Sequence, residues 1–401
     1  MNTPMAKMVL SIRAAVVPAA AAVLLARSGS AAVLEFPVTI RNTYACIDIS
    51  VGTPPQNHVL VFDTGSATSW IANENCVDGG CDNVSGYPWK AYDSDSSVTS
   101  KDLGIYDSIS YLGGGTGGEV YSDKFSHDGL TWTQTFISAN QTSMGFIAGE
   151  GFFGLAFSSI AEEDTKTVME TLMQDRQVDV PRFGLYYGTE FNDTHGHPGK
   201  GVLTLGDSHE RKYVDGDVAW VPGKKDSGVY ELWRSNLKTF YGERKDNNGN
   251  IQNNGSLQYD LGAANGVFDT GAGLIYVPDA TIDAVYDSIG WNYTALLHGD
   301  YLPSCTDMNS TWSVTFTFES DESSDFTNIT LTGDQLKIPG FAYQTDKCNP
   351  PFSTSGSPHL FLLGQLYLRN FYSIFDFGGL KVEDYNVRIG FGNLKKEWRG
   401  I

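Results

Sequence analysis

The sequence contains the pentapeptide Val-Phe-Asp-Thr-Gly twice, which places aspartates at positions 63 and 269. In each copy an apolar run leads into the aspartate, and the glycine permits a tight turn that a side chain would obstruct. Two carboxylates held close together cannot both ionise easily, so they share a proton. One member of a pair such as Asp63 and Asp269 can then take a proton from water while the other donates one to a carbonyl oxygen. That chemistry suits direct attack of water on a peptide bond.

Each pentapeptide is followed at a similar distance by two apolar residues and a glycine, at 152–154 and 362–364. A repeat with two matching landmarks predicts two lobes that are built alike, each delivering one carboxylate to a shared site. The hydroxyls of Thr64 and Thr270 could form hydrogen bonds across the lobe interface. The alternative is a pair of structural turns in a duplicated β protein. It is disfavoured because an ionisable group behind a buried strand is costly without a purpose.

The elements that must position these carboxylates are mostly strands. Runs rich in Val, Ile, Thr, Tyr and Phe alternate with Gly, Asn, Asp and Ser turns, as in 58–62, 130–136 and 312–318. Helical spacing of apolar residues predicts one short helix in each half, over 165–176 and 280–289. The sequence therefore predicts an all-β, bilobal fold. We expect a signal peptide over 1–32, an N-terminal lobe over 33–212 and a C-terminal lobe over 213–401.

The charge of the chain and the composition of its N-terminal segment limit the classes of partner and the cellular location that can be expected. The chain has 47 acidic against 27 basic residues, a formal net charge of −20, which disfavours nucleic acid as a partner. Either solubility or adaptation to an acidic medium explains the charge. A positive start followed by an uncharged run over 14–26 and the small residues Ser30, Ala31 and Ala32 is typical of a secretory signal. The run is too short to span a membrane.

The cysteines and sequons agree with export. Cys76 and Cys81 bracket a tight turn that a disulfide could close, Cys305 and Cys348 form the second expected pair, and Cys46 is expected as a buried free thiol. No paired Cys-x-x-Cys or Cys/His cluster suggests a metal. Seven Asn-x-Ser/Thr sequons predict a partly glycosylated surface: Asn83, Asn140, Asn192, Asn254, Asn292, Asn309 and Asn328.

Further motifs accompany the two Asp-Thr-Gly copies in a fixed order. In chain order they are Gly52-Thr53-Pro54-Pro55-Gln56, Trp70, the Cys76 to Cys81 loop, Ile109-Ser110-Tyr111, Trp220-Val221-Pro222, Leu363-Gly364 and Arg388-Ile389-Gly390-Phe391. With these motifs the chain resembles the pepsin-like aspartic endopeptidases over about residues 36 to 394. The sharing of one proton by two carboxylates is itself best known from that family.

The resemblance implies roles for particular residues. Asp63 and Asp269 would form the catalytic dyad, and Ser66 would donate a hydrogen bond to the first aspartate. Tyr111 would be the tyrosine of a flap that closes over substrate, with Trp70 as its hydrogen-bond partner. The adjoining motif residues Thr64, Gly65, Thr270 and Gly271 would shape the substrate site.

Two departures from the family pattern matter. The flap continues from Tyr111 with five glycines over 113–118 where the family has fewer, which predicts a looser lid. Ala272 stands where a threonine or serine hydroxyl is common, so the ionised form of Asp269 should be stabilised less, and the working pH should be higher. The flap glycines also fit a dinucleotide-binding pattern, which a strand-like continuation argues against.

The sequence therefore predicts a secreted, monomeric aspartic endopeptidase that acts at acidic pH, with an acidic vacuole as the alternative destination. Its partners would be polypeptides bound in extended form, with apolar side chains preferred beside the scissile bond. No metal or organic cofactor is implied, and no membrane span. The alternative is a pepsin-like protein that binds a protein or glycan without cutting it.

Overall fold

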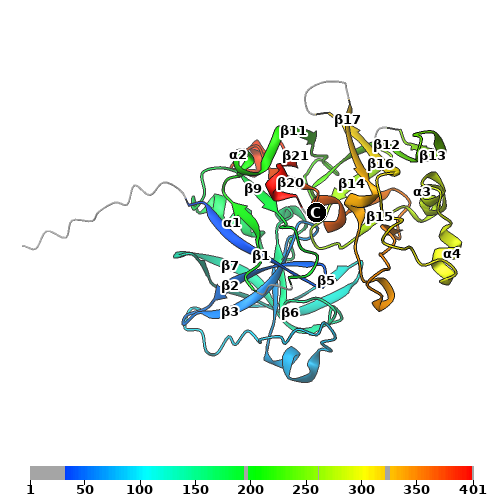
Figure 1. Ribbon diagram of the computed structural model, residues 1–401. Coiled ribbons are helices and arrows are strands. Elements are labelled where there is room, and N and C mark those ends of the chain that lie inside the picture. Colours follow the sequence, from blue (N-terminus) through cyan, green and yellow to red (C-terminus); the bar gives the residue numbers. More distant parts are fainter. Residues whose placement is uncertain (1–31, 194–196, 261, 321–325, 400–401) are drawn as a thin grey trace, which may run out of the picture. The chain divides into compact units, whose positions relative to one another are not determined.

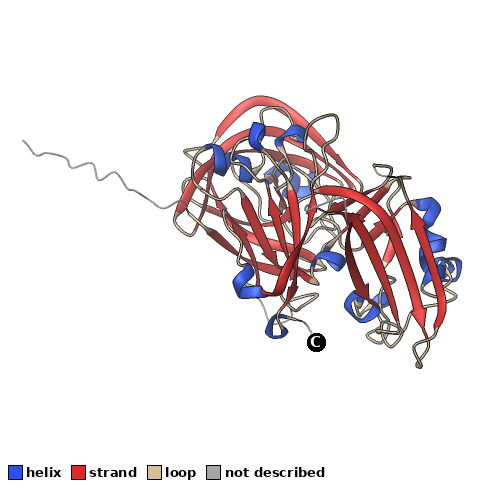
Figure 2. Cartoon of the chain, turned by 90° about the horizontal axis from the view of Figure 1, so that it is seen from above, coloured by secondary structure: helices blue, strands red, loops and turns tan. Residues whose placement is uncertain are grey.

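The computed structural model describes residues 32–193, 197–260, 262–320 and 326–399. Within these ranges the chain forms strands with a few short helices (Figure 1), so the predicted all-β fold is confirmed. Seen from above, the strands gather in two groups (Figure 2), as expected of a bilobal molecule. The predicted signal peptide over 1–32 lies outside the described residues except for Ala32.

The larger sheet has 13 strands among the described residues and includes the first carboxylate motif. Its strands, in sheet order, are β11 (Val214–Pro222), β21 (Arg388–Leu394), β20 (Phe371–Asp376), β9 (Arg182–Tyr186), β10 (Gly201–Leu205), β1 (Leu34–Arg41), β2 (Tyr44–Val51), β3 (Gln56–Asp63), β8 (Gly151–Gly154), β4 (Trp70–Ala72), β7 (Leu130–Thr142), β6 (Gly114–His127) and β5 (Lys101–Tyr111).

The smaller sheet has eight strands in the described part of the chain and leads into the second motif. Along β16, inward apolar residues alternate with outward polar ones, which is the period of a strand with one buried face. The strands, in sheet order, are β17 (Phe326–Thr332), β16 (Trp312–Glu319), β12 (Arg234–Lys245), β14 (Asn265–Phe268), β19 (Leu360–Leu363), β15 (Ile275–Val277) and β18 (Phe352–Thr354), with β13 (Ile251–Gln258) paired to β12.

The helices are short. The α-helices of the described residues are α1 (Val168–Gln174), α2 (Glu210–Tyr213), α3 (Ile282–Ser288), α4 (Tyr293–His298) and α5 (Gln365–Leu368). Single helical turns span Cys76–Gly80, Ser158–Ile160, Asp279–Thr281, Gly333–Leu336, Phe341–Tyr343, Val382–Asp384 and Lys396–Trp398. The two helices predicted from spacing are present as α1 and α3, and each buries its apolar face.

The repeat seen in the sequence is a repeat in strand pairing. β3 runs parallel to β8, with Phe62 opposite Phe153, and β14 runs parallel to β19, with Phe268 opposite Leu363. β4 pairs antiparallel to β8 and parallel to β7, and in the other half β15 pairs antiparallel to β19 and parallel to β18. The strand orders β3-β8-β4-β7 and β14-β19-β15-β18 therefore correspond. The apolar pair before each landmark glycine therefore supports the strand that carries the aspartate motif.

Each half contains one of the two helices predicted from spacing, but α1 and α3 do not occupy equivalent places in the repeat. α1 comes after β8, whereas α3 comes after β15, so the two helices follow different strands of the repeated frame. The element that comes after β19, the counterpart of β8, is the short helix α5. Apolar spacing identified two real helices but carried no information on which strand of the frame each one follows.

The two halves share both a sheet and a core. β20 and β21, the last strands of the chain, pair with β9 and β11 beside the N-terminal strands, as the red and green ribbons of Figure 1 show. Trp233 is fully buried between Phe183 and Phe375, and its indole N–H donates to the carbonyl of Leu155 at 2.8 Å. The lobes are thus connected by strand pairing and by packed aromatic rings.

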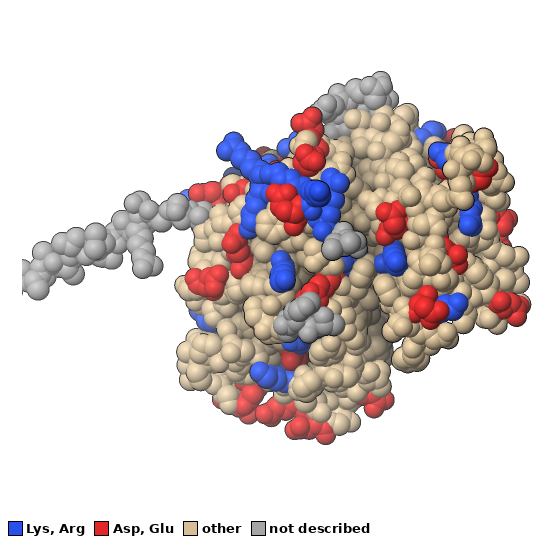
Figure 3. All heavy atoms as spheres, viewed as in Figure 1, with Lys and Arg blue, Asp and Glu red and all other residues tan. Residues whose placement is uncertain are grey.

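Disulfides join Cys76 to Cys81 and Cys305 to Cys348, the pairs expected from the sequence, and Cys46 is a buried free thiol. On the face shown in Figure 3, Lys and Arg side chains gather near α2 and the C-terminal end, while elsewhere acidic and basic residues are interspersed among uncharged ones. Among the described residues, no helix has the length and apolar character that crossing a membrane requires.

Candidate active site

The two Asp-Thr-Gly loops meet face to face. Asp63 ends β3 and Asp269 follows β14, and both carboxylates lie at the floor of one cleft. A Cβ built on Gly65 would lie 2.6 Å from the Asp269 carboxylate, and one on Gly271 would lie 2.5 Å from Asp63. Each glycine therefore leaves the space that the opposite aspartate occupies, a close approach that any side chain would prevent.

The threonines of the two motifs hold the loops together. The Thr64 N–H donates to Thr270 Oγ1 at 3.0 Å, and the Thr270 N–H donates to Thr64 Oγ1 at 2.9 Å. Each hydroxyl then donates to a carbonyl across the interface, that of Phe268 or Phe62, at 2.8 Å. Both threonines are almost completely buried, so they fix the spacing of the aspartates and do not line the cleft.

The two aspartates have similar backbone partners and different side-chain partners. The Gly65 N–H donates to Asp63 at 2.8 Å, and the Gly271 N–H donates to Asp269 at 2.8 Å. The Ser66 hydroxyl also donates to Asp63, whereas the equivalent position beside Asp269 is Ala272, which has no hydroxyl. The dyad is therefore asymmetric, and the ionised form is better stabilised at Asp63 than at Asp269.

The pKa values follow this asymmetry. Burial raises the pKa of Asp63, while the Ser66 hydroxyl and the Gly65 N–H oppose that rise. Burial raises the pKa of Asp269 well above its usual range, and the neighbouring Asp63 charge raises it further. The proton shared by the pair is thus expected to reside mainly on Asp269.

The cleft above the dyad has a volume of about 860 Å³ and a largely apolar lining. Both lobes and the hairpin of β5 and β6 contribute to its walls. Besides the dyad, both motif glycines and the hairpin, the lining includes Tyr44, Met144, Phe146, Phe152, Leu232, Val267, Ala272, Tyr276, Leu360, Leu362 and the Thr354 to Gly356 segment. Such a surface suits apolar side chains of a polypeptide. Most of these residues lie far from the Asp-Thr-Gly motifs in the chain, so spacing gave no signal for them.

The hairpin expected as a flap is formed by β5 and β6. Tyr111 pairs with Gly114 across the two-residue turn, and the Leu112 side chain is exposed at the tip. One of the extra glycines serves strand packing, because a Cβ on Gly118 would lie 2.0 Å from the Ser138 carbonyl oxygen. That glycine allows β6 to approach β7 closely, so it does not loosen the lid as the sequence suggested.

The hydrogen bond expected between Tyr111 and Trp70 stays a prediction: the Trp70 indole N–H lies close enough to oppose the rise that burial causes in the pKa of Tyr111, but the geometry of a normal hydrogen bond is not reached. The Tyr111 hydroxyl and the Trp70 indole N–H are both buried without a hydrogen-bond partner among the described residues. Trp70 is fully buried and packs against Phe152, which in turn contacts the Tyr111 ring. Trp70 thus supports the aromatic layer behind the cleft, and the structure does not place it where a substrate would touch it.

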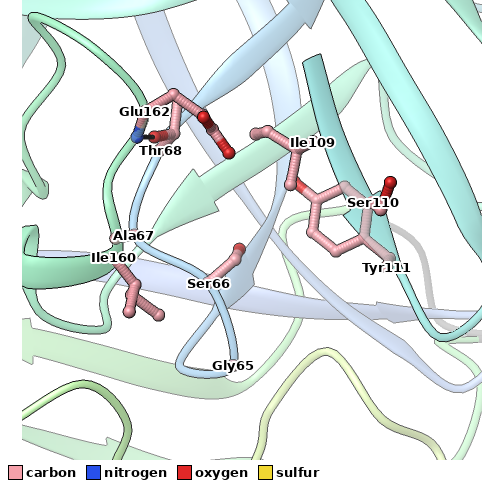
Figure 4. Close-up of a pocket in the computed structure, with 9 residues that line it drawn as sticks. All are labelled: Gly65, Ser66, Ala67, Thr68, Ile109, Ser110, Tyr111, Ile160 and Glu162. Carbon is pink, nitrogen blue, oxygen red and sulfur yellow. Dashed lines mark hydrogen bonds between the residues drawn. The ribbon is translucent and has the colours of Figure 1, made fainter. Parts of the chain in front are cut away.

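A second hollow adjoins the dyad on the side of the Asp63 loop (Figure 4). It is bounded by Gly65, Ser66, Ala67, Thr68, Ile109, Ser110, Tyr111, Ile160 and Glu162. The sequence identified Gly65, Ser66 and Tyr111, but it gave no signal for Glu162. That residue reaches the site only because its segment folds back onto the Asp63 loop, where its N–H donates to Thr68 Oγ1 at 2.8 Å.

No group of three or more His, Cys, Asp or Glu side chains in the described ranges could hold a metal ion. The fold and site thus define a two-lobed β protein in which two repeat-related carboxylates face each other across a cleft. A family model described as eukaryotic aspartyl protease matches residues 43–385. The chain belongs to the eukaryotic aspartyl protease family.

Curated relatives agree with this assignment. The chain is 27% identical to cathepsin E of Mus musculus over 342 residues, which cover 83% of this chain and 78% of the relative. It is 27% identical to cathepsin E-A of Xenopus laevis over 345 residues, covering 84% and 77%. It is 25% identical to gastricsin of Mus musculus over 367 residues, covering 88% and 83%.

Proposed function

We propose that the chain is an aspartic endopeptidase that hydrolyses peptide bonds with a water molecule activated between Asp63 and Asp269. The observation that carries this proposal is the meeting of two buried carboxyl groups, delivered by equivalent loops of the two lobes, at the floor of one cleft. Membership of the aspartyl protease family supports it.

The asymmetry of the dyad assigns the proton transfers. Asp63, stabilised as a carboxylate by Ser66 and Gly65, takes a proton from water. Asp269, whose pKa is raised more strongly, donates its proton to the carbonyl oxygen of the scissile bond. Water then adds directly to the carbonyl carbon, so no covalent intermediate with the enzyme is required.

The cleft accounts for substrate class. An extended polypeptide would lie between the lobes under the hairpin, where Tyr111 and Leu112 line the roof. The apolar lining favours apolar side chains beside the scissile bond. Because the dyad needs one proton, activity is expected at acidic pH and should fall once the second proton is lost.

Secretion and the division of the chain complete the proposal. Two disulfides fit an oxidising compartment, and sequon residues such as Asn254 and Asn328 are exposed. We assign residues 1–32 to a signal peptide, 33–212 to the lobe with Asp63 and the flap, and 213–401 to the lobe with Asp269. The mature protein would act as a secreted monomer, or in an acidic vacuole.

The experiment is cleavage of an unfolded protein by the purified chain from about pH 3 to 7, a range that spans carboxylate titration. The products are sequenced to separate internal cleavage from trimming of the ends. Asp283→Asn, which alters an exposed carboxylate on α3, is the matched control for Asp63→Asn. Internal cleavage by the parent and the control, but not by Asp63→Asn, is expected. No cleavage by a folded parent chain at any pH would contradict the proposal.

A further inference from the structure

The hollow beside the Asp63 loop, called here the acidic pocket, carries a carboxylate in addition to those of the dyad in the main cleft. It has a volume of about 190 Å³. Gly65, Ser110 and Tyr111 line both this pocket and the main cleft. A side chain of a polypeptide that lies across the dyad can therefore enter it. Glu162 is the one charged residue of its lining.

Glu162 is held in place by the loop that carries the first aspartate. Its N–H donates to Thr68 Oγ1 at 2.8 Å, and the same hydroxyl lies 2.7 Å from that of Thr165. The Thr165 N–H in turn donates to the Glu162 carbonyl at 3.0 Å. In Figure 4 the Glu162 carboxylate points into the pocket, toward Ile109. The carboxylate therefore has a defined position relative to the dyad.

A second carboxylate lies next to Glu162. Asp107 on β5 accepts a hydrogen bond from the Glu163 N–H at 3.1 Å. Burial raises the pKa of Glu162, and the charge of Asp107 raises it further. Within the described part of the chain, neither carboxylate has an ion-pair partner among the Lys, Arg and His residues. Glu162 and Asp107 are thus left without a countercharge from the described part of the protein.

The Tyr111 hydroxyl provides a second sign that the pocket receives a polar ligand. This oxygen is buried, and no hydrogen bond of normal geometry reaches it from the described residues, although Ser66 and Trp70 lie close enough to oppose the rise that burial causes in the pKa of Tyr111. In Figure 4 the hydroxyl end of the ring points into the same space as the Glu162 carboxylate. Burial and then the Asp63 charge raise the pKa of Tyr111, and the Glu162 charge adds a smaller rise, which places the hydroxyl within electrostatic reach of Glu162. A buried polar atom without a partner is costly, so a donor from a ligand would be stabilised here.

We propose that the acidic pocket is a subsite for a basic side chain, Lys or Arg, of the polypeptide substrate near its scissile bond. The cation would meet the Glu162 carboxylate and donate to the Tyr111 hydroxyl, with Asp107 adding to the negative potential. The methylene stem would pack against Ile109 and Ile160, because long basic side chains place their stems on apolar surface while the charge stays paired. This inference rests on the proposed endopeptidase function and adds a charged preference to an otherwise apolar specificity.

The test uses peptides with one cleavage site, in which lysine or the uncharged analogue norleucine stands at each position around that site. For the parent chain, kcat/KM is expected to favour lysine over norleucine by about tenfold at one position, which corresponds to the low end for one hydrogen bond to a charged group. Glu162→Gln should bring that ratio close to one. Glu163→Gln, which alters the exposed neighbouring carboxylate, should keep the ratio of the parent.

Three outcomes would overturn the inference: a ratio near one at every position in the parent, an unchanged ratio in Glu162→Gln, or an equal loss in Glu163→Gln. If the folded parent cleaves no peptide, the proposed function fails, and the pocket is judged by binding of the same peptides. Tighter binding of a lysine peptide that is lost in Glu162→Gln would then support the subsite. Equal binding of the two peptides would overturn it.

Discussion

The asymmetry of the dyad leads to a prediction about Ala272→Ser. Asp63 accepts hydrogen bonds from the Gly65 N–H and from the Ser66 hydroxyl. Asp269 accepts one from the Gly271 N–H, but position 272 is an alanine and offers no hydroxyl. The two backbone hydrogen bonds have the same length, 2.8 Å. A serine at position 272 is therefore expected to reach Asp269 as Ser66 reaches Asp63.

The magnitude follows from the strength of one hydrogen bond to a charged group. Such a bond contributes about 1.5 to 3 kcal/mol, and about 1.4 kcal/mol corresponds to one pKa unit. Because the new hydroxyl stabilises the ionised form of Asp269, the second proton should leave the dyad about one to two pH units lower. The alkaline limb of the kcat/KM profile should move down by that amount. Ser66→Ala should move the acid limb in the opposite direction, because Asp63 loses its donor.

The assay is the pH dependence of kcat/KM, which reports the pKa values of the free enzyme. The peptide substrate should carry no side chain that titrates between about pH 3 and 8. A crystal structure of Ala272→Ser would show whether the new hydroxyl meets Asp269. An unchanged alkaline limb in a variant whose hydroxyl does contact Asp269 would refute the assignment of the second proton to that residue.

Three other predictions concern stability. Thr270→Val removes a buried hydroxyl that accepts from the Thr64 N–H and donates to the Phe62 carbonyl, both on the opposite loop, so the free energy of unfolding should fall by about 2 to 4 kcal/mol in denaturant titration. Burial raises the pKa of Glu150 from 4.5 to about 7. Between these two pH values the folded protein holds a proton that the unfolded chain loses. The contribution of Glu150 to the free energy of unfolding is therefore full below about pH 4.5 and is lost as the pH rises through about 7. Relative to Glu150→Gln, the parent should lose about 3 kcal/mol over that window. Replacing Cys305 and Cys348 together by alanine should lower stability by about 2 to 5 kcal/mol.

Each of these predictions has a control and a contrary outcome. Thr330→Val, at an exposed hydroxyl pair on β17, should change stability by less than about 0.5 kcal/mol, and an equal loss in both threonine variants would argue against the cross-lobe role. A constant difference between parent and Glu150→Gln from about pH 4.5 to 7 would show that the pKa of Glu150 is not raised in the folded protein. Unchanged stability without the Cys305–Cys348 bond would show that this loop is held by packing alone.

The sequence predicted the parts of the fold that depend on local pattern. Alternating strands, the two helices and the strands that lead into Asp63 and Asp269 follow from residues that are neighbours in the chain. The repeated landmarks, 152–154 and 362–364, also predicted two equivalent lobes, because they mark the inner strand of each repeated frame. The return of β20 and β21 to the N-terminal sheet was not predicted, since pairing between strands so far apart leaves no local signal.

The site was predicted where residue type alone decides its chemistry. The dyad, its glycines and the threonine pair lie together because the motif specifies both the loop and the carboxylate. The expected hydrogen bond between Tyr111 and Trp70 stays a prediction, because it depends on how two aromatic side chains pack around Phe152, which spacing does not encode. Glu162 was missed for a similar reason: its place is set by a hydrogen bond to Thr68 from a segment remote in sequence.

The central claim is that Asp63 and Asp269 act together on one water molecule. The most direct test is the cleavage rate of Asp63→Asn and of Asp269→Asn, each measured on one peptide at the optimum pH of the parent, with folding verified by denaturant titration. Because each carboxyl transfers a proton that the other cannot supply, both variants should lose at least about a thousandfold in kcat. A rate within about tenfold of the parent in either folded variant would contradict the shared role of the two residues.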